Sequence, residues 1–369
     1  MATSVSSLIL AVNAGSSSLK LALFTASPEP DLLCNWSASG IGSSDIRVKY
    51  SRHNNVKSDQ INDHVSAFEF FLKTLDEDKE NEPGSENISH ICHRVVHGGS
   101  YTDPVEIDKT TLDRLAALSD LAPLSIPPYV YTYAIDPSVA RQKNLRKYGF
   151  HGLSYAFILK SVAAFLHKPE LQTSIIALHL GAGASACAIR DGLSIDTSMG
   201  LTPLSGLPGA TRSGDIDPSL IFHYTAQGDN VGRMSYGKTR SMHITEAERV
   251  LNTEAGWKSL TGTTDFREII EFVIISVGAF FVQLQGRVHA LVFSGGLGEN
   301  SSALRQAIVE RSGCLGFDLL SNERNNNPPE GETVFDIGAA RGGPKILVCK
   351  TNEELEIARQ CIAKPEFWK

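Results

Sequence analysis

Short apolar runs alternate along the chain with longer stretches in which apolar residues have helical spacing. The short runs predict strands at Leu8–Val12, Leu19–Phe24, Ile175–Leu178, Ala290–Ser294 and Lys345–Cys349. The helical spacing predicts helices at His64–Leu75, Thr110–Ser119, Ser154–Leu166, Glu268–Leu284, Ser302–Ser312 and Asn352–Ile362. Strands that alternate with helices predict an α/β fold. Charged stretches rich in Pro and Gly predict surface loops at Asp76–Glu86 and Asn322–Glu332.

Two of the predicted strands run into turns built almost entirely from small residues. The segment LAVNAGSSSLKLALF, from Leu10 to Phe24, interrupts an apolar run with Asn-Ala-Gly-Ser-Ser-Ser and places Lys20 in its second half. A similar segment, IIALHLGAGASACAI, extends from Ile175 to Ile189. This internal repeat predicts duplicated domains that face one cleft.

Small residues in such turns let a phosphate chain approach the backbone N–H groups closely. Serine hydroxyls and Lys20 would add donors and a positive charge, and Asn13 would add an amide near a metal–phosphate centre. The alternative is a tight hairpin in which the serines make only local turns. A third glycine turn, FSGGLGEN from Phe293 to Asn300, follows a strand and precedes a helix, which favours an adenine-nucleotide site.

Three basic residues stand out because their neighbours are apolar or small. Arg94 lies in CHRVVHGG, Arg212 lies in GATRSGDIDP, and His151 is flanked by glycines in YGFHGLSY. An arginine in such a setting usually has an anionic partner, because an unpaired buried charge is costly. Phosphate would suit all three, whereas a structural ion pair to Asp215 or Asp217 and a packed histidine are the alternatives.

Composition narrows the possible partners. The 369 residues carry a formal net charge of -7, which disfavours nucleic acid or an anionic membrane as the main partner. The six cysteines are scattered and have no zinc-ligand spacing, so reduced thiols are expected. We expect neither a signal peptide nor a membrane span, since the longest apolar stretch, Phe272–Leu284, is too short to cross a bilayer.

A series of motifs in one order resembles the acetate/propionate kinase family of the sugar kinase–Hsp70–actin superfamily. The motifs are NAGSSSLK, HRVVHGG, YGFHG, DTSMGLTPLSGLPGATRSGDIDP, GGLGENS and TNEELEIAR, and the resemblance extends from about Leu8 to Arg359. It implies duplicated ribonuclease-H-like α/β domains of the actin/hexokinase type around a nucleotide cleft. We expect residues 1–140 with 352–369 to form the first domain, and residues 141–351 to form the second.

The resemblance also implies a reaction, a carboxylate phosphotransfer. ATP and acetate would give ADP and acetyl phosphate in a reversible reaction that uses Mg²⁺, with no nucleic acid and no membrane as partner. A homodimer, a cytoplasmic location and a role in acetyl-CoA biosynthesis are further implications.

Individual roles follow from the same motifs. Asn13 and Glu353 would belong to the Mg²⁺ site, Arg94 would bind the acetate or acetyl phosphate, and His151 and Arg212 would stabilise the phosphoryl transition state. The implied nucleotide-binding residues are Lys20, His179, Leu180, Gly181, Ala182, Gly183, Asp265, Phe266, Arg267, Gly296, Leu297, Gly298, Glu299 and Asn300.

The chain departs from the family pattern at four places. Several dozen residues, with the family's catalytic aspartate motif, are missing where Leu121–Ser125 runs directly into IPPYVYTY, and a helical stretch is shortened after Thr261–Ile269. Ala182 replaces an asparagine of the second turn, and Tyr155 replaces the last histidine of the GFHG-x-S-H motif. Two hypotheses therefore stay open: an acetate kinase, or a non-catalytic or impaired nucleotide-binding homologue. The sharp joins favour skipped coding segments over gradual drift.

Overall fold

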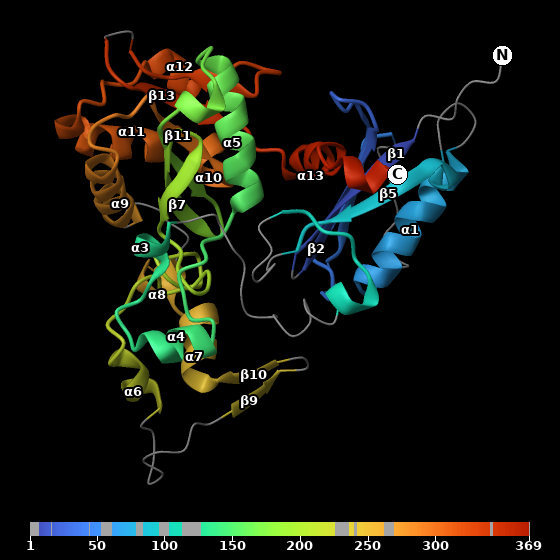
Figure 1. Ribbon diagram of the computed structural model, residues 1–369, viewed down its shortest axis with the longest axis horizontal. Helices are drawn as coiled ribbons and strands as arrows, with labels where there is room; N and C mark the ends of the chain where they lie inside the picture. The colour runs from blue at the N-terminus through green and yellow to red at the C-terminus, as the bar shows by residue number, and fades with distance from the viewer. Residues whose placement is uncertain are drawn as a thin grey trace. The chain divides into compact units, whose positions relative to one another are not determined.

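The computed structural model describes residues 7–15, 17–43, 45–52, 61–78, 84–95, 103–112, 127–225, 236–239, 242–261, 269–339 and 342–368. They fall into two compact units (Figure 1). Unit 1 contains the described residues within Met1–Val96, Asp103–Ala117 and Asn352–Lys369, and unit 2 contains those within Leu118–Thr351. Residues 127–140 thus group with unit 2, while the predicted domain boundary at residue 140 stays a prediction.

Unit 1 is built on a five-stranded sheet with the order β4-β3-β2-β1-β5. Its strands are β1 (Leu8–Ala14), β2 (Ser18–Thr25), β3 (Leu32–Ser39), β4 (Arg47–Tyr50) and β5 (Ile88–His93). The neighbouring strands are antiparallel except β5, which pairs with β1 in parallel. Helices α1 (His64–Glu77) and α13 (Glu353–Ile362) pack on this sheet, and short 3₁₀ turns lie at Ser85–Asn87 and Pro365–Trp368.

The alternation of side chains along β1 decides which helix covers which face. Leu8, Leu10 and Val12 join the core that also includes Phe71 of α1. Asn13 therefore projects from the opposite face, on which α13 lies (Figure 1).

Unit 2 is built on a six-stranded sheet with the order β12-β13-β11-β6-β7-β8. Its strands are β6 (Ile175–Leu180), β7 (Ala184–Arg190), β8 (Leu193–Thr197), β11 (Ala290–Ser294), β12 (Val334–Asp336) and β13 (Lys345–Cys349). A separate hairpin pairs β9 (Tyr236–Thr239) with β10 (Met242–Thr245). The helices are α3 (Pro128–Tyr131), α4 (Pro137–Gln142), α5 (Gly152–Phe165), α6 (Leu220–Thr225), α7 (Glu246–Thr253), α8 (Gly256–Thr261), α9 (Ile269–Gln283), α10 (Gly295–Asn300), α11 (Ser302–Arg311) and α12 (Asn322–Asn326). Short 3₁₀ turns lie at Glu170–Gln172 and Gly313–Leu315.

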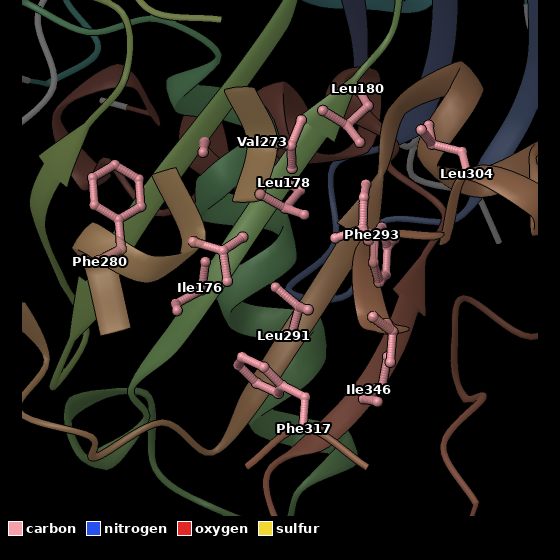
Figure 2. Packing of buried hydrophobic residues seen from close by; sticks show 14 of the residues in the cluster. Ile176, Leu178, Leu180, Val273, Phe280, Leu291, Phe293, Leu304, Phe317 and Ile346 are labelled. Atoms are coloured by element: carbon pink, nitrogen blue, oxygen red, sulfur yellow. The ribbon is translucent and has the colours of Figure 1, made fainter. Parts of the chain in front are cut away.

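The core of unit 2 lies between one face of this sheet and helices α9 and α11. Figure 2 shows Leu178 of β6 and Phe293 of β11 among the side chains from the strands, with Val273 of α9 and Leu304 of α11 packed beside them. All four are at most 5% exposed. Burial on this scale is the main favourable contribution to folding.

The two sheets share one strand arrangement. In unit 1, β1, β2 and β3 form an antiparallel meander and β5 runs parallel to β1. In unit 2, β6, β7 and β8 form the same meander and β11 runs parallel to β6. The predicted α/β fold and its internal duplication are therefore present in the chain.

The five predicted strands are confirmed, as are the predicted helices that correspond to α1, α5, α9, α11 and α13. The predicted helix at Thr110–Ser119 lies mostly outside the described residues. The prediction of a surface loop at Asn322–Glu332 is wrong in part, because α12 begins there and Asn325 is only 2% exposed. Its side chain is buried because its oxygen accepts a hydrogen bond from Nε of Arg305 over 2.8 Å.

Candidate active site

In unit 1, three polar side chains meet where β1 ends and α13 begins. The amide Nδ2 of Asn13 donates hydrogen bonds to Glu353 and Glu354, each over 2.9 Å. Asn352 caps α13 by accepting from the backbone N–H of Leu355 over 2.9 Å. Acidic residues in the first turn of a helix are favoured by its dipole, so the sequence of α13 places both carboxylates at this point.

Arg94 follows β5 and joins the same group of residues. Its Nη1 donates to Oδ1 of Asn13 over 3.2 Å, and its Nε lies 3.8 Å from Oε2 of Glu353. The side chain remains 23% exposed, and a guanidinium carries five N–H donors. Arg94 is thus held in place while keeping donors for an anion.

The first small-residue turn closes the β1–β2 hairpin. The N–H of Gly15 donates to the carbonyl of Ser18 over 2.8 Å, and Nε2 of His64 lies 2.7 Å from the carbonyl oxygen of Gly15. Asn13 and Lys20 are opposite each other in the β1–β2 register, so both lie on the face that α13 covers in part. Lys20 is exposed, and its ammonium is available to a ligand.

In unit 2, the second and third small-residue turns come together at the ends of β6 and β11. A Cβ on Gly181 would lie 3.8 Å from the backbone nitrogen of Gly296, so the two turns approach within van der Waals contact. Gly295 has φ +75°, and a Cβ there would lie 2.8 Å from the carbonyl oxygen of Leu180. Only glycine fits this position. The next residue, Gly296, is exposed to solvent.

His151 precedes α5 and its ring lies against the second turn. Its backbone has φ 60° and ψ 29°, the left-handed region that non-glycine residues seldom adopt. The ring stacks on His179 with centroids 4.0 Å apart, and Nδ1 lies 2.8 Å from Oγ of Ser185. The opposite edge faces Gly183, whose Cβ, if present, would lie 3.9 Å from Nε2. One edge of the ring is thus packed against Ser185, while the other lies next to the second glycine turn.

Arg212 reaches the same glycine. A Cβ on Gly183 would lie 3.4 Å from its Nη1. The two acids considered as structural partners bond elsewhere: Asp215 accepts from Ser205 and the backbone of Gly206, and Asp217 accepts from Ser219. Burial lowers the pKa of the guanidinium from its ordinary value, because desolvation disfavours the charged form. A bound anion would offset the desolvation cost of this buried charge.

A buried arginine, which the sequence did not indicate as a functional residue, stabilises the third turn, Gly295–Asn300. Arg305 of α11 is 1% exposed, and its Nη1 donates to the carbonyls of Gly298 and Glu299 over 2.9 and 2.8 Å. Its Nε and Nη2 donate to the side-chain oxygen and the carbonyl of Asn325 over 2.8 and 2.7 Å. The Glu299 carboxylate accepts from the N–H groups of Gly295 and Thr351 over 3.0 and 3.1 Å.

The structure thus brings the predicted residues into two groups. Asn13, Arg94 and Glu353 form one in unit 1, and His151 and Arg212 form the other in unit 2 with the two glycine turns. A single pocket bordered by Arg94, His151 and Arg212 stays a prediction. The predicted nucleotide-binding residues Asp265, Phe266 and Arg267 lie outside the described residues.

The sequence assigned no role to Glu354, Ser185 or Tyr155, although Tyr155 stands where the family pattern has a histidine. Glu354 had a signal, because it adjoins Glu353 in the first turn of α13. Ser185 had one as well, since its register pairing with His179 follows from the hairpin. Neither signal indicates which side chain the residue contacts.

The donor set of unit 1 fits a magnesium ion. Mg²⁺ prefers oxygen ligands and is usually bound by one or two carboxylates together with substrate phosphates. Glu353 and Glu354 supply two carboxylates that converge on one amide. Within the described part of the chain no cluster of three His, Cys, Asp or Glu residues could hold a metal ion on its own. Substrate oxygens would have to complete such a site.

A bilayer span requires a long and predominantly apolar helix. None of the described helices is both long enough and apolar enough to cross a bilayer.

Comparison with known proteins places these motifs in one family. The sequence model of the acetokinase family matches residues 8–130, 124–275 and 272–359. A probable acetate kinase of Emericella nidulans is 42% identical over 409 aligned positions, which cover 96% of this chain and 97% of that protein. The acetate kinase of Leifsonia xyli is 34% identical over 96% of this chain and 98% of that protein.

Solved structures of similar fold are kinases of the same kind. A propionate kinase from Francisella tularensis matches with a TM-score of 0.79 and 31% identity, covering 96% of this chain and 98% of that one. The acetate kinase of Porphyromonas gingivalis matches with a TM-score of 0.78 and 26% identity, covering 97% of this chain and 100% of that one. The predicted fold class, duplicated actin/hexokinase-type domains, is confirmed by these matches.

The matched segments of the family model meet at residues 124–130 and 272–275, near the two joins where the sequence predicts missing stretches. The alignment with the Emericella protein spans 409 positions although this chain has 369 residues, so that relative carries residues that this chain lacks. The motifs, the fold and these matches together show that the chain belongs to the acetokinase family.

Proposed function

We propose that the chain is an acetate kinase, which transfers the γ-phosphoryl group reversibly between ATP and acetate to give ADP and acetyl phosphate. One observation of the geometry carries the proposal: Nη1 of Arg212 and Nε2 of His151 both lie against Gly183 at a glycine turn. Two donors at a position without a side chain suit an anionic group that must approach the backbone.

The residues of unit 2 would hold the phosphoryl group and the nucleotide. Arg212 and His151 would donate to the equatorial oxygens, which carry the charge of the transition state. Backbone groups of His179–Gly183 and Gly296–Asn300 would contact the nucleotide. Catalysis of this kind is mainly positioning and charge neutralisation, so the side chains need no covalent role.

The residues of unit 1 would hold the carboxylate substrate and the metal. Arg94 would bind acetate through the donors that Asn13 and Glu353 leave free, since a guanidinium matches a carboxylate in a two-bond geometry. Glu353, Glu354 and Asn13 would hold Mg²⁺, and Lys20 would contact nucleotide phosphates. When bound, Mg²⁺ neutralises charge on the phosphate oxygens.

A homodimer is part of the proposal, and the outer face of α9 supports it. Phe272, Ile275 and Val282 of this helix are 43%, 69% and 73% exposed, an unusual surface for a soluble protein. A second copy of the chain would cover them. Light scattering should give twice the chain mass for the wild type and the single chain mass for Ile275→Glu; a monomeric wild type would refute the dimer.

The location and wider role follow from family resemblance alone. We assign the chain to the cytoplasm and its acetyl phosphate to acetyl-CoA biosynthesis.

The test is formation of acetyl hydroxamate from ATP, acetate, Mg²⁺ and hydroxylamine by the purified chain, with propionate in a parallel assay. Product that depends on ATP and on a carboxylate supports the proposal. Calorimetry that detects ATP binding without any product would favour the impaired nucleotide-binding homologue, which lacks the family's aspartate motif.

A further inference from the structure

A buried hydroxyl pair lies behind the His151 ring. Oγ of Ser185 lies 2.8 Å from Nδ1 of His151 and 2.5 Å from the hydroxyl oxygen of Tyr155. Ser185 is fully buried and Tyr155 is 1% exposed. The three side chains form a chain of hydrogen bonds that runs from the protein interior to the ring.

Local structure fixes this arrangement. Tyr155 lies one helical turn after His151 in α5, and its backbone N–H donates to the carbonyl of His151 over 2.9 Å. Both side chains reach the strand below, where each lies within hydrogen-bond distance of Oγ of Ser185. Ser185 of β7 is paired with His179 of β6, on which the His151 ring stacks.

The chemistry of the site decides the direction of the hydrogen bonds. A phosphoryl oxygen can only accept, so the Nε2 atom that faces Gly183 must carry a proton if His151 is to bind it. In a neutral imidazole, Nδ1 is then an acceptor, and the hydroxyl of Ser185 must donate to it. Because serine has a single hydroxyl proton, Ser185 must in turn accept from Tyr155.

We propose that Tyr155 and Ser185 are positioning residues that hold His151 as the neutral tautomer with its proton on Nε2, ready to donate to the transferred phosphoryl group. This inference rests on the proposed phosphotransfer, because the phosphoryl oxygen that His151 would bind is what requires the proton on Nε2.

The surroundings of Tyr155 keep this donor in place. Burial raises the pKa of the Tyr155 phenol well above its ordinary value of 10.0, since the phenolate would be poorly solvated. Tyr155 therefore retains its proton under assay conditions. When Ser185 accepts this hydrogen bond, its own hydroxyl proton can be donated to Nδ1 of His151.

The experiment uses the full chain with ¹⁵N-labelled histidine. Long-range ¹H–¹⁵N spectra distinguish protonated from unprotonated ring nitrogens, and the His151 signals are assigned by their loss in His151→Gln. We expect the proton on Nε2 in the wild type. Tyr155→Phe and Ser185→Ala should each move the population toward the Nδ1–H form or toward a mixture.

Steady-state kinetics provide the second readout. Partners that orient a metal-bound histidine typically contribute about 10–100-fold to activity. We expect the same order of effect here, so Tyr155→Phe should lower kcat by about 10–100-fold while KM for ATP changes little. The matched control is Tyr148→Phe, which removes another buried hydroxyl, one that donates to the carbonyl of Asn144 over 2.7 Å. It should leave kcat and the His151 spectrum unchanged.

The outcomes separate the two proposals. A wild-type His151 protonated on Nδ1, or a Tyr155→Phe variant with an unchanged spectrum and unchanged kcat, would overturn the positioning role. If the wild type shows no turnover, the proposed function fails, and the spectra alone decide the hydrogen-bond direction.

Discussion

The side-chain amide of Asn13 lies 2.9 Å from the carboxylate of Glu353, although 340 positions separate the two residues in the sequence. The contact exists because α13 returns to the face of the sheet from which Asn13 projects. Helix α13 therefore completes a site that begins on β1.

This contact predicts how metal dependence responds to mutation. Glu353→Gln removes one of two carboxylates beside Asn13, so the Mg²⁺ concentration for half-maximal activity should rise by about tenfold or more. Glu366→Gln, an exposed acid in the same unit, is the control and should behave as wild type. Removal of Mg²⁺ by a chelator should abolish activity in all three proteins. Equal Mg²⁺ dependence of Glu353→Gln and wild type would remove Glu353 from the metal site.

The geometry of the third glycine turn predicts which glycine substitutions destabilise the fold. Gly295→Ala forces a side chain into a left-handed conformation against the carbonyl of Leu180 and should destabilise the chain by about 1–3 kcal/mol. Gly313→Ala meets no atom within 4 Å and should not destabilise it. Urea denaturation measures both, and equal midpoints would contradict the steric argument.

Gly296→Ala tests the same turn for nucleotide contact. Its new Cβ also meets nothing within 4 Å, so the fold should keep its stability. The methyl group would nevertheless occupy the space that a phosphate needs. Calorimetry should therefore show weaker ATP binding, whereas unchanged affinity would place the nucleotide elsewhere.

The buried Arg305 predicts a large stability effect from a position without a catalytic role. Arg305→Met leaves the carbonyls of Gly298 and Glu299 and the side chain of Asn325 without their donors, which should cost about 2–4 kcal/mol. Arg311→Met, in the same helix, breaks only an exposed ion pair and should cost about 0.5 kcal/mol or less. Similar urea midpoints for the two variants would contradict this account.

The elements that sequence predicted best are those buried on both faces. β6 and β11 are largely apolar runs because helices cover both sides of their sheet. They can therefore be recognised as strands from the sequence alone. β5, with the sequence ISHICH, was missed because polar residues interrupt its apolar run, and even Ile91 is 50% exposed. α12 was missed because asparagine-rich sequence predicts turns, and only the partner Arg305 explains why Asn325 is buried.

The candidate residues show a similar division. His151 and Arg212 could be selected as candidates because glycine and small neighbours leave few structural uses for a basic side chain. Their support could not be predicted, since Ser185 meets His151 only through the pairing of distant segments. Sequence patterns reveal local chemistry, whereas tertiary hydrogen bonds depend on the assembled sheet.

His289 predicts a pH dependence of stability. Burial and the nearby positive charge of Lys168 lower its pKa below the ordinary value of 6.5, and its Nδ1 accepts from the backbone N–H of Ser174 over 3.0 Å. The unfolded chain therefore binds this proton more readily than the folded chain. This contribution to stability is present above the unfolded pKa and is lost as the pH falls toward the folded pKa.

Substitution isolates that contribution. His289→Asn keeps an acceptor for Ser174 but cannot titrate, so its urea midpoint should fall less than that of wild type between about pH 7.5 and about pH 5.5. Parallel pH profiles of the two proteins would show that His289 does not contribute.

Synthesis of ATP from acetyl phosphate, ADP and Mg²⁺ tests the central claim most directly, with wild type, Arg212→Ala and the exposed control Arg141→Ala compared at equal concentration. We expect ATP from wild type and Arg141→Ala, and a rate lower by about 10²–10³-fold in Arg212→Ala. No ATP from folded wild type, or equal rates with and without the Arg212 guanidinium, would contradict the account.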